Sequence, residues 1–236
     1  MRQNRIYLAA TFFCLICIGV VMIYSSSCVY AMQELKDSAY FLKRHLVFLG
    51  IGFILTLAAM AIDYRILQRY AKPLLIFSIL LLILVLIPGI GKRSSGAQRW
   101  FKFGMLSFQP SELVKLAVII YTADFLARKQ KLITDFKQGF VPLMLIMGLV
   151  CALVVKQPDL GTTVEIAIVV LGMMFVAGAK MSHLGLIALA AVPVVIYLVT
   201  SASYRMARIM AFLDPRQDAQ GIGFQLTQSQ IALGSG

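Results

Sequence analysis

The sequence predicts an all-α membrane protein, a polytopic bundle of transmembrane helices. Of its 236 residues, 60% are hydrophobic and 14% are charged, whereas about a quarter of the residues of a soluble domain are charged. Seven apolar stretches are long enough to cross a bilayer, which takes about twenty mainly apolar residues in a helix. The stretches lack the alternation of a membrane β-barrel, so helices are left to satisfy their backbone hydrogen bonds in lipid.

The seven predicted spans belong to one membrane domain, residues 1–236. We expect them at residues 6–25, 45–62, 73–90, 110–127, 140–155, 158–178 and 183–201. They leave an external loop at residues 89–109 and an external tail at residues 202–236. The uncharged run near the N-terminus lasts until Glu34, which favours an uncleaved first span over a signal peptide.

Basic residues between the spans bear on the orientation of the chain in the membrane. A bare count of Lys and Arg on the two sides does not decide it. The compact cluster Arg128, Lys129 and Lys131 is the stronger topological signal, and it favours a cytoplasmic N-terminus.

The formal net charge of +12 does not indicate nucleic acid. The basic residues lie in short connectors between apolar runs and do not form one soluble face. Membrane lipid, in particular anionic lipid, or a phosphate-bearing substrate is the partner that this distribution favours. The four cysteines show no ligand spacing, so we expect neither a disulfide framework nor a zinc site.

Ionisable residues inside two apolar segments mark the candidate site. The fourth span contains Glu112, Lys115 and Asp124, and the sixth contains Asp159 and Glu165. Such residues cost a few kcal/mol in a bilayer, so they indicate a functional site by default.

These two spans also begin alike, each with Gln-Pro followed by an acid within two residues. Proline at the first helical position and an acid in the first turn are ordinary features of a helix start. That explanation does not extend to Lys115, although Glu112 three residues earlier can pair with it. The preceding loop adds four cations, Lys92, Arg93, Arg99 and Lys102. Two helix N-termini beside these cations predict a mouth that attracts phosphate.

Residues 204–213 follow the seventh span and form an amphipathic segment. Arg205 and Arg208 share one helical face, and the opposite face is apolar. The segment is either a helix lying in the membrane interface or a cationic connector, and both readings stay open. Residues 220–236 end in a glycine-rich phrase without a closing signal, so we expect the chain to be incomplete.

Five sets of residues resemble the motifs of one known family. They are Gly96-x2-Arg99-Trp100; Gln109-Pro-Ser-Glu112-x2-Lys115; Gln157-Pro-Asp-Leu-Gly-Thr162; Phe175-Val-Ala-Gly-Ala179; and Arg205-x2-Arg208 with Gly221-x-Gly223-x-Gln225 and Gln228-Ser229. Their order and spacing resemble the shape, elongation, division and sporulation (SEDS) proteins, the FtsW/RodA/SpoVE group. The Gln-Pro-Ser-Glu helix start and its long preceding loop look closer to the division and sporulation branches than to RodA.

The resemblance implies a peptidoglycan glycosyltransferase that polymerises lipid II, the undecaprenyl-pyrophosphate-linked disaccharide pentapeptide. It implies a ten-span fold in the bacterial cytoplasmic membrane, with the N-terminus inside and the site on the outer face. A class B penicillin-binding protein transpeptidase is the implied protein partner. Polymerisation requires a general base for the attacking hydroxyl and cations for the leaving pyrophosphate.

The resemblance also implies roles for individual residues. The predicted substrate-binding residues are Arg99, Trp100, Lys102, Glu112, Lys115, Asp159, Arg205, Arg208 and Gln228. Among them, Glu112 and Asp159 are expected to position Lys115 or to hold a divalent cation, Mg²⁺ or Mn²⁺, and the pattern does not decide whether that metal is obligatory. Glu165 has no counterpart in the family and is expected to be a polar contact inside the bundle.

The catalytic aspartate that the resemblance implies would follow Gly236, where this sequence ends. We therefore expect a truncated chain with about seven of ten spans, inactive by itself. Two alternatives stay open for the function: a flippase or transporter for the lipid-linked precursor, and a non-catalytic scaffold that recruits a transpeptidase.

Overall fold

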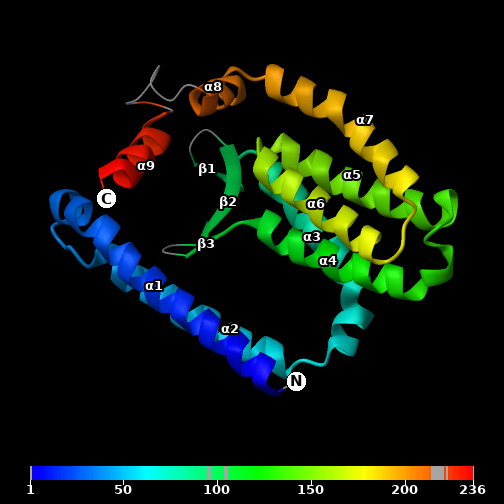
Figure 1. Ribbon diagram of the computed structural model, residues 1–236, viewed down its shortest axis with the longest axis horizontal. Coiled ribbons are helices and arrows are strands. Elements are labelled where there is room, and N and C mark those ends of the chain that lie inside the picture. Colours follow the sequence, from blue (N-terminus) through cyan, green and yellow to red (C-terminus); the bar gives the residue numbers. More distant parts are fainter. Residues whose placement is uncertain (1, 95–96, 104–105, 214–220, 222, 236) are drawn as a thin grey trace. The chain divides into compact units, whose positions relative to one another are not determined.

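The computed structural model describes every residue except 1, 95–96, 104–105, 214–220, 222 and 236 (Figure 1). The described chain is mainly helical, which confirms the predicted class. Its contacts divide it into two compact units, Met1–Arg69 and Tyr70–Gly236.

The first unit is a hairpin of two long helices, α1 (Arg2–Leu35) and α2 (Tyr40–Ala61), which pack against each other. Nearly all of their large apolar side chains are exposed, as expected for helices whose surface faces lipid. In the turn, the Asp37 carboxylate accepts the Ala39 N–H at 3.0 Å and pairs with the Lys43 ammonium at 2.9 Å. The hydrogen bonds from Lys43 and Ala39 hold the pKa of Asp37 below its usual value.

Helix α1 continues ten residues past the predicted end of the first span at Ser25. The prediction stopped at a run of serines, which favour helix ends. In the structure, Ser27 Oγ donates to the carbonyl oxygen of Ile23 at 2.6 Å. This hydroxyl bonds to the turn below it, so the serine run stays within the helix.

Helix α3 (Tyr64–Leu86) begins nine residues before the predicted third span, which was placed at 73–90. The sequence predicts a helix start at Pro73, but Pro73 lies inside α3. The helix instead starts just after Asp63, whose carboxylate accepts the N–H of Arg65 at 2.9 Å. A capping acid therefore sets this start more strongly than the proline does.

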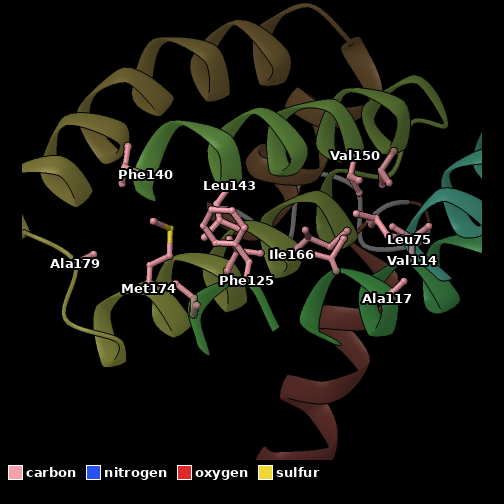
Figure 2. Close-up of a cluster of buried hydrophobic side chains, with 14 of the residues drawn as sticks. Leu75, Val114, Ala117, Phe125, Phe140, Leu143, Val150, Ile166, Met174 and Ala179 are labelled. Atoms are coloured by element: carbon pink, nitrogen blue, oxygen red, sulfur yellow. The ribbon is translucent and has the colours of Figure 1, made fainter. Parts of the chain in front are cut away.

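The second unit has its core between α3 and three further helices, α4 (Pro110–Arg128), α5 (Val141–Lys156) and α6 (Leu160–Val176). A fourth helix, α7 (Met181–Thr200), packs at the margin of this core. Figure 2 shows the core, in which Val114 and Phe125 of α4 lie among Leu143 of α5 and Ile166 of α6. Each of the four helices begins and ends within two residues of its predicted span.

Among the described residues, five helices are long and apolar enough to cross a membrane. Of the seven predicted spans, the two outside this set are α4 and α6. Helix α6 is apolar but has 17 residues, and every 18-residue stretch of α4 carries more than two charged side chains. These are also the helices that carry the candidate site. The membrane sides of the loop and the tail stay a prediction.

The connector at residues 89–109 is a small antiparallel sheet, which the sequence analysis missed. Its order is β1 (Lys92–Ser94), β2 (Ala97–Phe103) and β3 (Leu106–Phe108). Strand β2 contacts α4 and contributes the buried Phe101. The predicted tail likewise contains two helices, α8 (Ser203–Leu213) and α9 (Phe224–Ser235).

Between α4 and α5 the chain forms two short helical turns, η1 (Gln130–Leu132) and η2 (Phe136–Phe140). Asp135 caps η2 by accepting the N–H of Gln138 at 2.9 Å. Gly139 is buried against the preceding turn: a Cβ on it would lie 2.1 Å from the carbonyl oxygen of Leu132. Only a residue without a side chain fits there unless the backbone moves.

We predict that Gly139→Ala destabilises the protein by about 1–3 kcal/mol, because the added methyl group overlaps the backbone of Leu132. The matched control is Gly148→Ala in α5, where a Cβ meets no atom within 4 Å. The free energy of unfolding of this control variant should be unchanged or rise by up to about 1 kcal/mol. Thermal unfolding of the purified protein in detergent measures both, and equal melting temperatures for the two variants would contradict the prediction.

Candidate functional site

Arg99, on β2, holds the junction between α5 and α6. Its Nε donates to the carbonyl oxygen of Gln157 at 2.7 Å, and its Nη2 donates to that of Pro158. Its Nη1 lies 3.7 Å from the Asp159 carboxylate. The end of α5 exposes carbonyl groups that lack helical partners and attract cations. The guanidinium therefore caps α5.

The two Gln-Pro segments contact each other at this junction. Asp159 is the N-cap of α6 and accepts the N–H of Thr162 at 3.2 Å. From the start of α4, Gln109 Nε2 donates to Ser111 Oγ at 2.8 Å and to Asp159 at 3.3 Å. We call Arg99, Gln109, Gln157, Pro158 and Asp159 the Arg99 clamp.

Gln157 also ties the Arg99 clamp to α3. Its side chain is 1% exposed, and its Nε2 donates to the carbonyl oxygen of Leu82 at 3.2 Å. The clamp thus fixes the starts of α4 and α6 relative to the end of α3.

Lys115 lies between two carboxylates. Its Nζ is 3.0 Å from Glu112 on its own helix and 3.0 Å from Glu165 on α6. The ion pair between Lys115 and Glu112, which are three residues apart on α4, confirms the predicted contact. Asp159, which was expected to position Lys115 or a divalent cation, lies beside Arg99 in this structure, and the second acid on Lys115 is Glu165.

Lys115 contacts Glu165 because the two residues lie equally far from the starts of their helices. Lys115 lies five residues after the start of α4 at Pro110, and Glu165 lies five residues after the start of α6 at Leu160. At 1.5 Å per residue, both lie about 7.5 Å along their helices. Helices α4 and α6 lie side by side and run in the same direction (Figure 1), so the two side chains meet.

The three charged groups line a groove of about 250 Å³ between α4 and α6. We call it the Lys115 groove; it is lined by Glu112, Lys115, Leu116, Val118, Ile119, Glu165, Ile166, Val169 and Val170. The Lys115 side chain is 21% exposed, against 58% for Glu112 and 56% for Glu165. The groove is charged at one end and apolar along the rest.

The charge of this groove differs from the cationic mouth that the sequence predicts. With both carboxylates ionised, one ammonium and two carboxylates carry a net charge of −1. Of the predicted loop cations, Arg99 is occupied in the clamp. The side chains of Lys92, Arg93 and Lys102 lie outside the described residues. An anion reaching Lys115 therefore meets two acids first.

The other predicted site residues lie on different elements. Trp100 follows Arg99 on β2 and is half-buried. Arg205 on α8 donates to the carbonyl oxygen of Leu198 at 2.6 Å, which caps the end of α7. Arg208, also on α8, lines a separate hollow of about 790 Å³ with residues of α9. Gln228 is exposed on α9.

The predicted divalent-cation ligands do not come together as a pair. Glu112 pairs with Lys115 and Asp159 with Arg99, so each carboxylate already has a cation. Within the described part of the chain, no group of three His, Cys, Asp or Glu side chains could hold a metal ion. This arrangement does not fit a metal site built on Glu112 and Asp159.

Sequence reasoning underestimated Glu165 and Gln109. The signal for Glu165 was present, because an acid in an apolar helix requires a partner and Lys115 lies at the same distance from its own helix start. The contact of Gln109 with Asp159 carried no comparable signal, since it depends on how closely two helix starts approach.

Loss of the Arg99 clamp should destabilise the bundle. We predict that Arg99→Ala lowers the free energy of unfolding by about 2 kcal/mol, because two carbonyls and the Asp159 carboxylate lose a charged donor. Arg99→Lys should recover part of this loss. The control, Arg69→Ala at an exposed position of α3, should change it by less than about 0.5 kcal/mol. Unfolding in SDS mixed micelles measures these values, and wild-type stability of Arg99→Ala would refute the capping role.

Comparison with known proteins places this arrangement in a family. The sequence model of the FtsW/RodA/SpoVE family, described as cell cycle protein, matches residues 5–236. A probable peptidoglycan glycosyltransferase FtsW from Trichlorobacter lovleyi is 44% identical over 218 residues, which are 92% of this chain and 57% of that protein. Stage V sporulation protein E of Bacillus subtilis is 42% identical over 222 residues, covering 94% of this chain and 61% of that protein.

Solved structures agree with the sequence relatives. A chain from the structure titled "Structural coordination of polymerization and crosslinking by a peptidoglycan synthase complex" superposes with a TM-score of 0.67 at 32% identity. The superposition covers 91% of this chain and 64% of that one. The chain thus spans about three fifths of the length of the curated relatives it matches. The matches over nearly all of its residues confirm the resemblance: the chain belongs to the FtsW/RodA/SpoVE family of membrane proteins.

Proposed function

We propose that this protein is a peptidoglycan glycosyltransferase that polymerises lipid II at the outer face of the bacterial cytoplasmic membrane, in cell division or sporulation. Relatives that carry this enzyme name or the sporulation protein name are 42–44% identical to it. The single observation that carries the proposal is Lys115, an ammonium group held in an open groove between two helix starts.

The groove suits the leaving group of this reaction. The acceptor's 4-hydroxyl attacks C1 of the donor sugar, the bond from C1 to pyrophosphate breaks, and undecaprenyl pyrophosphate leaves. A fixed cation lowers the barrier by stabilising the charge that develops on the leaving oxygen. Lys115 supplies that cation, and the neighbouring Leu116, Ile119 and Val169 are apolar enough to adjoin a prenyl chain.

The remaining residues of this proposal bind or position the substrate. The Arg99 clamp sets the start of α6 and so the depth of Glu165 opposite Lys115. Trp100, Lys102 and Gln228 are proposed to contact the sugar or pyrophosphate of lipid II from β2 and α9. We assign no general base among the described residues.

The two arginines of α8 take separate roles. Arg205 caps α7 through Leu198, whereas Arg208 faces a hollow that it shares with Phe212, Phe224 and Ser229. We propose that Arg208 binds a phosphate of lipid II or of a membrane lipid. The amphipathic α8 then lies in the membrane interface with Arg208 toward the head groups.

The partner and the orientation are part of the same proposal. One solved relative is a chain of a peptidoglycan synthase complex, which supports a class B penicillin-binding protein transpeptidase as the partner here. The cluster Arg128, Lys129 and Lys131 at the end of α4 supports a cytoplasmic N-terminus. The starts of α4 and α6 then open to the outside.

We expect Lys115→Ala to lower the rate of lipid II polymerisation about 100-fold or more, because the leaving pyrophosphate loses its cation. Lys115→Arg should retain part of the activity. The protein is expressed from its native gene and incubated with labelled lipid II. The glycan strands that form are then separated and quantified on gels. The matched control is Lys131→Ala, which changes an exposed lysine in η1, just beyond the opposite end of α4; this variant should polymerise lipid II normally.

Normal polymerisation by Lys115→Ala would remove Lys115 from the mechanism. Movement of fluorescent lipid II across vesicle membranes without polymer would instead favour a transporter. Normal wall synthesis in cells that carry Lys115→Ala would favour a scaffold.

A second prediction separates Arg208 from Arg205. Arg208→Ala should weaken binding of a prenyl diphosphate about tenfold, since one charged hydrogen bond is lost. Arg205→Ala should lower the melting temperature and leave the affinity of the folded protein unchanged. Binding to protein in nanodiscs by calorimetry measures the affinities. Equal affinities for Arg208→Ala and wild type would exclude a phosphate contact at α8.

A further inference from the structure

Glu165 reaches Lys115 from across the groove. Glu112 lies on the same helix as Lys115 and pairs with it through local geometry, three residues away. Glu165 lies on α6, and its carboxylate closes the groove from the opposite wall at 3.0 Å from the ammonium. The two acids therefore make the same contact from different directions.

The pair with Glu165 contributes little to holding α4 and α6 together. The Glu165 side chain is 56% exposed, and exposed ion pairs add little to stability. The helices are joined by a buried apolar cluster, to which α4 contributes Val114 and Ala117 and α6 contributes Ile166 (Figure 2). Val170 of α6 belongs to the same cluster. Loss of the Glu165 charge leaves this packing in place.

The position of Glu165 is that of an anion bound to Lys115. A carboxylate and a phosphate both accept hydrogen bonds from an ammonium group at about 2.7–2.9 Å. Two carboxylates already occupy the single cation of this groove, so a phosphate added to all three groups would meet a net charge of −1. Like charges so close repel each other, and water and salt weaken this repulsion because both carboxylates are more than half exposed.

We propose that Glu165 competes with the diphosphate of the lipid substrate for Lys115. This inference rests on the proposed function, and it concerns the regulation of the same site. When the substrate binds, Glu165 leaves the ammonium and turns to the open side of the groove, where it is already half exposed. Glu112 stays and orients Lys115. When undecaprenyl pyrophosphate is the product, the return of Glu165 promotes its release.

The test is binding of farnesyl pyrophosphate, a short prenyl diphosphate, to the full 236-residue chain in nanodiscs at low salt. Glu165→Gln keeps the shape of the side chain and removes its charge. We expect it to bind about tenfold more tightly than wild type, since one repulsive charge near the diphosphate is removed. Salt should reduce the difference, because it screens exposed charges. A variant that merely damaged the fold would not bind more tightly.

Three further variants make the result specific. Asp135→Asn removes an exposed acid in the connector between α4 and α5, far along the chain from Lys115, and keeps the oxygen that caps η2. The affinity of this variant should equal that of wild type. Glu165→Asp keeps the charge and should bind no more tightly than wild type. Lys115→Ala with Glu165→Gln should show no gain over Lys115→Ala, because the competition acts through Lys115.

Unchanged or weaker binding by Glu165→Gln overturns the inference. The proposed function is tested separately by Lys115→Ala alone: affinity equal to that of wild type would show that Lys115 does not bind the diphosphate. Tighter binding by Glu165→Gln that persists without Lys115 would also overturn the inference, since the carboxylate would then act elsewhere.

Discussion

The contact of Arg99 with the turn between α5 and α6 is the interaction on which the site depends. One guanidinium donates to the carbonyl oxygens of Gln157 and Pro158, which directly follow α5, and lies beside the N-cap of α6. Gln109 joins the start of α4 to the same aspartate. Because both helix starts are tied to one point, residues equally far along α4 and α6 face each other.

The charges of the Lys115 groove follow from the energetics of an ammonium inside a helix bundle. A lysine in an apolar bundle requires counter-charges, since an unpaired buried charge costs several kcal/mol. One carboxylate would neutralise Lys115, and the structure provides two. The groove thus holds the cation firmly and at the same time weakens its attraction for anions. In the proposed reaction this balance is useful, because a product that carries a diphosphate must leave as readily as the substrate binds.

Much of the fold was predictable because its signals are local. The helices α4 to α7 begin and end within two residues of their predicted spans, since apolar runs there are bounded by proline, glycine or charge. The errors at α1 and α3 have local causes too, in a serine hydroxyl that bonds back to Ile23 and a capping Asp63 before the proline. The sheet at β1 to β3 was missed because β1 and β3 have only three residues each, and because the charges and glycines around β2 indicated a loop.

The sequence by itself determined the membrane class, the family motifs and the pairing of Lys115 with Glu112, because these depend on composition and on neighbours within one helical turn. Only the tertiary structure decided that Glu165, fifty residues away, is the second partner, and that Arg99 caps a helix end inside a clamp. These contacts depend on how two helix starts are placed against each other. Charged side chains that lie far apart in the sequence become partners only through that packing. The net charge of the groove therefore could not be predicted from either helix alone.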